Sequence, residues 1–317
     1  MSAHAMHKLR NIVHSALLIA GMALIVSACA WTLWGTEGIL WGLAGAILAM
    51  VLSPAVPPAL VLSLYRARPV GHAELPDVYA ALAELGRRAD LPAPPRLYYV
   101  PSAVLNAFAV GNRSAAAIAV TDGMLRNLTF RELVGVLAHE VSHIANNDLW
   151  VMNLADAMSR VTALMSYLGI VLLAVNLPLI AADGGVVPWF LVLLMIVAPT
   201  LMDLLQLALS RAREFDADLD AVRLTGETEG LALALAKLES WQGRFWERVL
   251  FPGRHVPDPS LLRTHPPTEE RIRRLMRLRD EVSSPPLSPP ATRVVVVPAT
   301  IMPVARPPRY RWPGIWY

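Results

Sequence analysis

Charged residues and cysteine are both scarce in this chain of 317 residues. Only 17% of the residues are Asp, Glu, Lys or Arg, whereas 55% are hydrophobic. This balance is too apolar for an ordinary water-soluble enzyme of this length. The single cysteine, Cys29, excludes an intrachain disulfide and gives no support to thiol catalysis. The formal net charge of +3 is too small to indicate a nucleic-acid partner, and no nucleic-acid recognition module is visible.

The sequence contains several long apolar runs. Four of them reach the roughly 20 residues that cross a lipid bilayer. We expect membrane-spanning helices at about residues 11–34, 39–65, 161–182 and 186–209. The second run contains Pro54, Pro57 and Pro58, so we expect it to be kinked or to end early.

The first apolar run has a competing interpretation. The sequence Val26-Ser27-Ala28-Cys29 resembles the small-residue motif before a lipidated cysteine, and it follows a basic start. The apolar stretch nevertheless continues through Trp34, as an ordinary span does, and we favour a span. Lipidation at Cys29 would leave the later topology unchanged.

Basic residues set the expected orientation in the membrane. They flank the outer ends of the two predicted hairpins, whereas the hairpin loops at residues 35–38 and 183–185 contain acidic residues and no basic ones. The flanking residues are Lys8, Arg10, Arg66, Arg68, Arg160, Arg211 and Arg213. The positive-inside rule therefore places both termini, residues 66–160 and residues 210–317 in the cytoplasm.

One motif carries recognisable chemistry, His139-Glu140-Val141-Ser142-His143. The preceding residues, 130–138, have apolar side chains at helical spacing. On a helix, His139 and His143 share a face and can bind one metal ion. Glu140 then lies beside the metal and can take a proton from metal-bound water. This arrangement is typical of a zinc peptidase.

A third ligand is needed, because zinc hydrolases keep three protein ligands and leave one position for water. The best candidate is Glu214, with Asp218 four residues further along the same expected helix. Asp218 would accept a hydrogen bond from the far nitrogen of a ligand histidine and fix its tautomer. Alone, this acidic segment would be interpreted as a solvated helix face, but the upstream histidine pair favours the ligand interpretation. Asp148, beyond the second histidine, is interpreted as a structural or capping residue.

A small β-sheet is expected beside the motif. Residues 76–89 have the pattern of an amphipathic helix, and strand character follows at 96–100, 106–111 and 115–121. An exposed edge strand can hold an extended substrate through main-chain hydrogen bonds. Asn106, Ala107 and Phe108 are therefore candidate substrate-binding residues. The same segment can instead simply pack behind the motif helix.

Several segments, taken in order, resemble the HtpX-type membrane zinc metalloproteases, relatives of the CAAX prenyl endopeptidases. They are residues 106–109, 121–125, 139–148, 211–218 and 264–267, followed by Arg271-Ile272, and the resemblance covers roughly residues 1–280. It implies His139, His143 and Glu214 as ligands of one zinc ion per subunit, with Glu140 as general base. It also makes His265 a candidate catalytic donor to the oxyanion, with Arg271 either supporting it or pairing with an acidic residue.

The expected protein is a mainly α-helical membrane protein, with four transmembrane helices and a cytoplasmic α+β zincin-like metalloprotease domain that contains a small β-sheet. The membrane hairpins are residues 1–68 and 161–209, and the two parts of the catalytic domain are residues 69–160 and 210–282. Residues 283–317 are rich in proline and are expected to form a mobile tail. A valine run at 294–297 would suit a strand added to a sheet edge, but a plain linker is the simpler interpretation.

The resemblance implies a zinc endopeptidase of the bacterial inner membrane, in contact with the lipid bilayer, that cleaves damaged or misfolded membrane proteins under stress. Two alternatives belong to other classes. A site-specific processing peptidase of the prenyl endopeptidase type is disfavoured because only four spans are expected. A non-proteolytic membrane chaperone has no physical need for three ligands and a general base.

Overall fold

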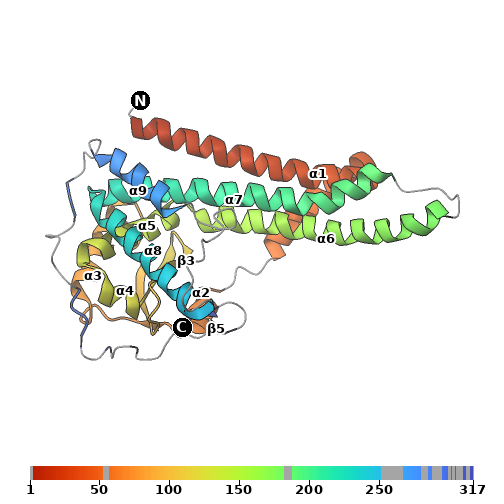
Figure 1. The fold of residues 1–317 in the computed structure, drawn as a ribbon. Coiled ribbons are helices and arrows are strands. Elements are labelled where there is room, and N and C mark those ends of the chain that lie inside the picture. The colour runs from red at the N-terminus through yellow and green to blue at the C-terminus, as the bar shows by residue number, and fades with distance from the viewer. Residues whose placement is uncertain are drawn as a thin grey trace. The chain divides into compact units, whose positions relative to one another are not determined.

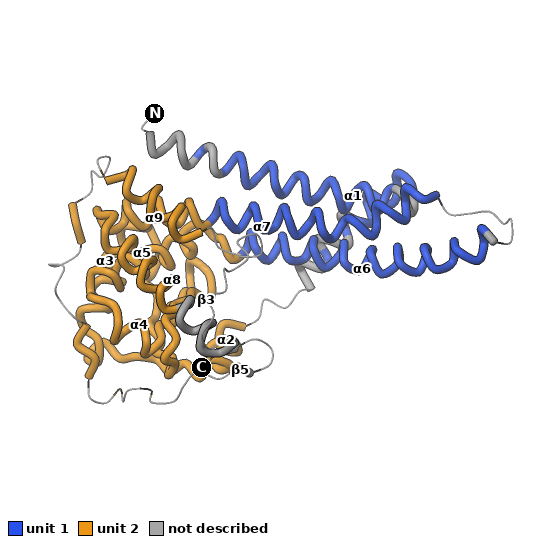
Figure 2. The backbone as a smooth tube through the Cα atoms, in the orientation of Figure 1, with its two compact units in different colours: residues 1–55, 150–213 blue, residues 56–149, 214–317 orange. Residues whose placement is uncertain are grey.

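The computed structural model describes residues 3–52, 57–181, 188–250, 267–279, 285–287, 295–298, 301, 304, 310–311 and 315–316. The chain forms two compact units, shown in different colours in Figure 2. Unit 1 contains Met1–Ala55 and Trp150–Arg213, and unit 2 contains Val56–Leu149 and Glu214–Tyr317. Each unit is therefore assembled from segments that are distant in sequence, because residues 150–213 interrupt the part of the chain that builds unit 2.

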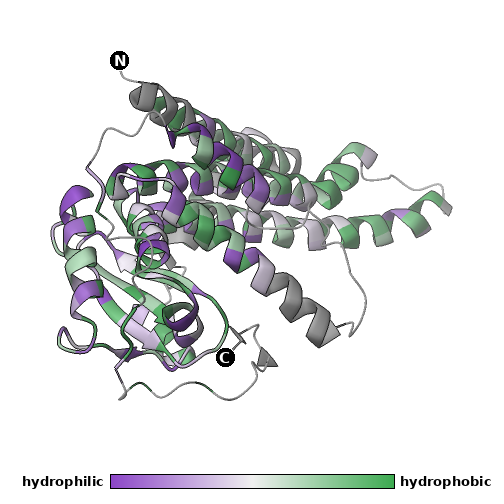
Figure 3. Ribbon diagram, turned by 60° about the vertical axis from the view of Figure 1, so that its left-hand side comes forward, coloured by the Kyte–Doolittle hydropathy of each residue, from purple (hydrophilic) through white to green (hydrophobic). Residues whose placement is uncertain are grey.

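Unit 1 is formed by long apolar helices, α1 (Ala3–Leu52) and most of α6 (Asp148–Ala181) and α7 (Trp189–Thr225). Within the described residues, three helices are long and apolar enough to cross a membrane, at Ile12–Trp31, Asp148–Ile180 and Trp189–Thr225. Figure 3 shows hydrophobic residues along them. Many of their large apolar side chains are exposed, which is the surface that a lipid environment requires.

Helix α1 consists of two helices joined at Gly35. The backbone there has φ 65° and ψ −148°, which is not helical and which glycine adopts readily. The second half packs against the first, since a Cβ on Gly42 would lie only 2.7 Å from the Cβ of Ala30. The turn is shorter than the four-residue loop expected from the sequence. Cys29 is buried within the first half, as a residue of an ordinary span can be.

The second expected span, residues 39–65, is interrupted where its prolines predict. Helix α1 ends at Leu52, and the short α2 (Pro58–Leu64) follows, with residues 53–56 outside the described residues. Helix α2 belongs to unit 2, where Leu62 is buried with Val100 and Val110 of the sheet, so the second apolar run does not form one continuous helix to residue 65. The count of four spans stays a prediction.

Unit 2 contains a four-stranded mixed sheet in the order β1-β2-β4-β3. The strands are β1 (Arg68–Pro69), β2 (Arg96–Val100), β3 (Ala107–Asn112) and β4 (Ala115–Thr121). β2 pairs with β4 in parallel, and β3 pairs with β4 in antiparallel orientation after a tight turn. The three longer strands agree with the sequence prediction to within one residue. Among the described residues β3 is an edge strand, with one side open for pairing.

The helices of unit 2 are α3 (Pro76–Arg88), α4 (Asp122–Asn127), α5 (Phe130–Ala145), α8 (Glu229–Leu250) and α9 (Thr268–Arg277), besides α2 and the polar end of α7. Twelve of the 16 residues of α5 are buried. Its first turn is fixed by a capping box, in which Thr129 and Glu132 satisfy each other's main-chain N–H groups. Lys237 of α8 lies 2.7 Å from the carboxylate of Glu132. Helix α5 is therefore a rigid support for the motif near its C-terminal end.

Close contact between α5 and α8 depends on Gly135. A Cβ at this position would lie 2.6 Å from the main-chain nitrogen of Leu231, which a flexible side chain cannot relieve. We therefore expect Gly135→Ala to cost about 1–3 kcal/mol through overpacking, despite the better helix propensity of alanine. Thermal unfolding of the detergent-solubilised protein should show a melting temperature lower by several degrees. Gly71→Ala is the control, because the nearest atom to its Cβ is 3.7 Å away. Equal melting temperatures for the two variants would contradict the prediction.

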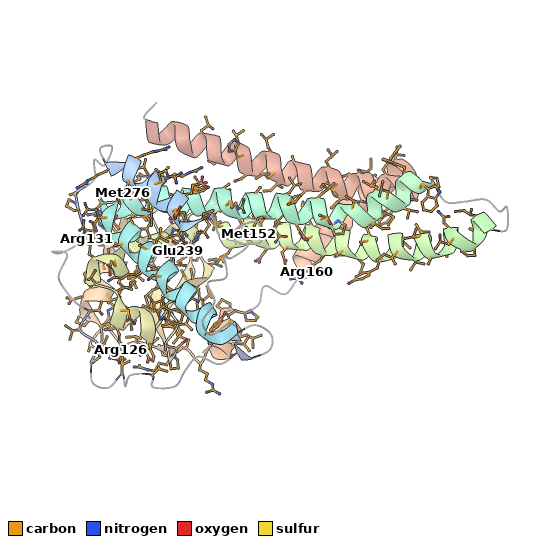
Figure 4. All side chains as sticks on the ribbon, in the orientation of Figure 1. Arg126, Arg131, Met152, Arg160, Glu239 and Met276 are labelled. Atoms are coloured by element: carbon orange, nitrogen blue, oxygen red, sulfur yellow. The ribbon has the colours of Figure 1, made fainter. Side chains whose placement is uncertain are left out.

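The C-terminal segment belongs to unit 2, and some of its described residues contact the helices of that unit. The N–H of Leu287 donates to the carbonyl of Thr225 at 2.7 Å. Arg126, labelled in Figure 4, donates to the carbonyl of Ile301 at 2.6 Å, and the side chain of Ile301 is buried in the core. Residues 295–298 are not part of a strand. Further along, β5 (Tyr310–Arg311) pairs with β6 (Ile315–Trp316). The mobility of this tail stays a prediction.

Candidate metal centre

The two motif histidines lie near the C-terminal end of α5. Their spacing of four residues places both rings on one face of the helix, and the two Nε2 atoms are 3.2 Å apart. His139 is buried and His143 is half-buried. Because the helix beneath them is packed into the core, the direction of both rings is fixed by the fold.

Glu214 of α7 completes a group of three potential ligands. One carboxylate oxygen, Oε2, lies 3.4 Å from Nε2 of His139, and the other, Oε1, lies 3.8 Å from Nε2 of His143. One donor atom from each of the three residues lies within 4.8 Å of the others. Two imidazole nitrogens and one carboxylate oxygen, directed at a common point, are a donor set that can hold a metal ion.

The surroundings of His139 favour a bound cation. Burial lowers the pKa of this imidazole, but hydrogen bonds to the carboxylates of Asp218 and Glu214 outweigh burial and raise the pKa to about 10. The two carboxylates therefore stabilise positive charge at this ring. Because a metal ligand has to be the neutral imidazole, metal binding at such a site is coupled to proton release.

Glu140 follows the first histidine directly and is half-buried. Burial raises the pKa of its carboxyl group, while the two neighbouring histidines partly oppose that change. The carboxylate accepts a hydrogen bond from the main-chain N–H of Ala109 in β3. Glu140 is thus held between the candidate metal ligands and the edge strand.

A buried ion pair supports the site from behind. Asp218 of α7 has Oδ1 at 3.1 Å from Nδ1 of His139. Arg271 of α9 binds Asp218 through two hydrogen bonds, of 2.8 Å from Nε and 2.6 Å from Nη2. A third nitrogen of Arg271, Nη1, lies 3.1 Å from Oε2 of Glu214. The guanidinium therefore orients one carboxylate that contacts a ligand histidine and one that is itself a candidate ligand.

Asp148 contacts the second ligand histidine. Its Oδ2 lies 2.7 Å from Nδ1 of His143. The sequence interpretation treats Asp148 only as a structural or capping residue, because it lies beyond the turn that carries the ligands. The signal for this contact is the Asn146-Asn147 pair, which is typical of a helix end and a turn.

The other predicted site residues are placed as follows. The main chain of Asn106 is hydrogen-bonded to Thr121, and its side chain is exposed. Ala107 begins the edge strand β3. The ring of Phe108 lies with its centroid 4.7 Å from that of Tyr65. His265 lies outside the described residues.

A helix with a His-Glu-x-x-His motif, a glutamate from a second helix that closes the donor set, and apolar spans in the same chain define a membrane-bound metallopeptidase. Residues 72–279 match the model of Peptidase family M48, and the chain belongs to this family. The resemblance to HtpX-type proteases is confirmed by similarity to curated proteins of that name.

Two of these relatives and one solved structure illustrate the similarity. The chain is 38% identical over 253 residues to a Protease HtpX homolog of Bifidobacterium longum, covering 74% of this chain and 81% of that protein. It is 32% identical to a Protease HtpX homolog of Nostoc punctiforme, covering 86% and 98%. The crystal structure of S. mikatae Ste24p aligns with a TM-score of 0.46 and 17% identity, covering 87% of this chain and 66% of that one.

Proposed function

We propose that this metallopeptidase is a zinc-dependent endopeptidase that hydrolyses misfolded or damaged membrane proteins. The observation that supports the chemistry best is the convergence of three donor atoms, from His139, His143 and Glu214, beside the carboxylate of Glu140. Metal–ligand bonds of about 2.0–2.2 Å in a tetrahedral site place neighbouring ligand atoms roughly 3.3–3.6 Å apart. The two Nε2 atoms are 3.2 Å apart, and the two carboxylate oxygens of Glu214 lie 3.4 and 3.8 Å from one Nε2 atom each. A small shift brings one oxygen near that range from both nitrogens, so these residues fit zinc.

Glu140 is the proposed general base and, afterwards, the general acid. When bound, zinc lowers the pKa of a water molecule toward neutrality and polarises the scissile carbonyl. Glu140 accepts a proton as that water attacks the peptide carbon, and it then delivers the proton to the departing amine. Burial raises the pKa of this carboxyl group, so that its charged and neutral forms lie closer in free energy near neutral pH. A group that first takes up a proton and then releases it needs both forms.

His265 and Arg271 complete the proposed machinery. His265, six residues before Arg271, is proposed to donate a hydrogen bond to the developing oxyanion. Arg271 is proposed to act as a support, because its guanidinium binds both Asp218 and Glu214. Asp218 in turn is proposed to hold the Nδ1–H of His139, so that Nε2 of this ring is free to bind zinc.

Substrate binding is proposed to use the open side of β3. In an antiparallel pair, successive residues direct their main-chain groups alternately toward the partner strand and away from it. Because the N–H of Ala109 reaches Glu140 and not β4, Ala107 and Ala109 direct their main-chain groups to the open side. An extended substrate can pair, as an added strand, with the N–H of Ala107 and with the carbonyls of Ala107 and Ala109. In this arrangement Asn106 and Phe108 flank the substrate with their side chains.

Replacement of Ala107 by proline tests this edge directly. Proline removes the N–H that we assign to the open side, and an edge strand tolerates it. Loss of one main-chain hydrogen bond of about 0.5–1.5 kcal/mol should raise KM for peptides roughly two- to tenfold, with a smaller change in kcat. Steady-state kinetics with fluorogenic peptides would measure both. Ala107→Val keeps the N–H and is the matched control, so an equal rise in KM for both variants would argue against strand pairing.

The proposed setting is the bacterial inner membrane, with four spans and a cytoplasmic active site. The support is the placement of basic residues on the outer ends of both hairpins. In sequence, the two histidine ligands precede the hairpin within residues 150–213 and Glu214 follows it. An even number of membrane crossings between them keeps all three ligands on one face of the membrane. Cysteine-accessibility labelling of single-cysteine variants at Arg66 and Thr36, in a Cys29→Ala background, would distinguish the two faces.

Two substrates distinguish the three possible activities of the zinc-loaded full-length protein in detergent. The proposal expects cleavage of an unfolded membrane protein, with several products, and no selective cleavage of a prenylated peptide. Cleavage of the prenylated peptide alone, at one bond, would replace the proposal by a processing peptidase. Zinc binding without cleavage of either substrate would favour a non-proteolytic chaperone.

A further inference from the structure

Asp148 lies where the chain turns from α5 into α6. Helix α5 ends at Ala145, and Asn147 has φ 55°, the left-handed conformation that asparagine tolerates better than most residues. In a continued helix, a residue five positions after His143 would lie about 140° away around the axis. The turn at Asn147 instead returns the carboxylate of Asp148 to the histidine ring.

The contact has the geometry of a support for a metal ligand. Asp148 is 3% exposed, and its Oδ2 is 2.7 Å from Nδ1 of His143. The opposite nitrogen of that ring, Nε2, is the atom that faces His139 and Glu214. A carboxylate that accepts the Nδ1–H keeps the lone pair on Nε2, where the metal is proposed to bind. The first turn of α6 also stabilises the negative charge of Asp148 through the helix dipole.

The two candidate ligand histidines thus have separate carboxylates from different helices. Asp218, behind His139, is also bound by two nitrogens of Arg271, so much of its negative charge is compensated. Asp148, in the first turn of α6, contacts His143 instead. We propose that Asp148 is a positioning residue that fixes His143 in the Nε2-ligating tautomer and strengthens zinc binding. This role rests on the zinc site proposed above.

The test compares Asp148→Ala and Asp148→Asn with a control, Asp220→Asn. Asp220 accepts a hydrogen bond of 2.8 Å from Asn146, at the same end of α5, and is not one of the three grouped ligands. The dissociation constant for zinc is measured by chelator competition on the full-length protein in detergent, and the visible spectrum of bound Co²⁺ reports the ligand field. The melting temperature of the metal-free proteins controls for stability.

We expect Asp148→Ala to weaken zinc binding about 10–100-fold and to alter the Co²⁺ spectrum. Asp148→Asn should show a smaller loss, because its amide oxygen still accepts the Nδ1–H without carrying a charge. Its metal-free melting temperature should equal that of the wild type, and Asp220→Asn should bind zinc as the wild type does.

Wild-type affinity in both Asp148 variants would overturn this role and leave the zinc site intact. An equal loss of affinity in Asp148→Asn and Asp220→Asn, with a lower metal-free melting temperature in both, would also overturn it, because the effect would then be structural. Failure of the wild type to bind zinc at all would refute the metal centre itself, together with this role.

Discussion

Replacement of Glu140 by glutamine should abolish peptide hydrolysis and leave metal binding intact. Glutamine keeps the size of the side chain and can still accept a hydrogen bond from the N–H of Ala109, which the Glu140 carboxylate accepts. It cannot take a proton from water at neutral pH. Loss of a general base costs about 10²–10⁴-fold in rate, so cleavage should fall below detection in a timed gel.

The comparison needs equal metal content. Both proteins are loaded with zinc, and bound metal is measured by atomic emission before the assay. Because Glu140 is not one of the three grouped donors, we expect one zinc per chain in each. Zinc-dependent cleavage by the glutamine variant at more than about a tenth of the wild-type rate would contradict the role, since a general base contributes at least about a hundredfold.

The histidine pair was predictable from the sequence because its geometry is local. A spacing of four residues on a helix fixes the relative direction of two side chains whatever the rest of the fold does. The helix itself is indicated by its apolar spacing, and its capping box at Thr129 and Glu132 sets its beginning. The strands beside it were equally clear, because they are short β-branched and apolar runs between turn residues.

Contacts that depend on turns or on distant packing were harder to predict. Glu214 lies 71 residues after His143, and only the chemical need for a third ligand, or the family resemblance, selects it among the nearby acids. The contact of Asp148 with His143 could not be predicted, because its direction depends on the left-handed backbone of Asn147. Ala109 carries no side-chain signal, since its contribution is a main-chain N–H. The prolines correctly predicted the break before α2, but not that α2 packs on the sheet.

Removal of Glu214 should have the second large effect, the loss of the metal itself. Zinc binding is worth roughly 10–16 kcal/mol in small zinc-binding peptides, so each of four ligands contributes roughly 3 kcal/mol. Glu214→Ala should therefore weaken zinc binding by more than about a hundredfold, since about 1.4 kcal/mol corresponds to a factor of ten. Activity should disappear together with the bound metal. His139→Ala should behave in the same way.

Thermal unfolding separates metal loss from general damage. A ligand that binds only the folded state at a thousandfold excess over its dissociation constant stabilises it by about 4 kcal/mol. Added zinc should therefore raise the melting temperature of the wild type and of Asp220→Asn. It should raise that of Glu214→Ala much less, because a site weakened a hundredfold gains at most about 1.4 kcal/mol at the same zinc concentration. The substitution also removes one of the two carboxylates that contact Arg271, so a moderately lower metal-free melting temperature is expected. A zinc-dependent rise of wild-type size in Glu214→Ala would show that this carboxylate is not a ligand, because the metal would then be held without it.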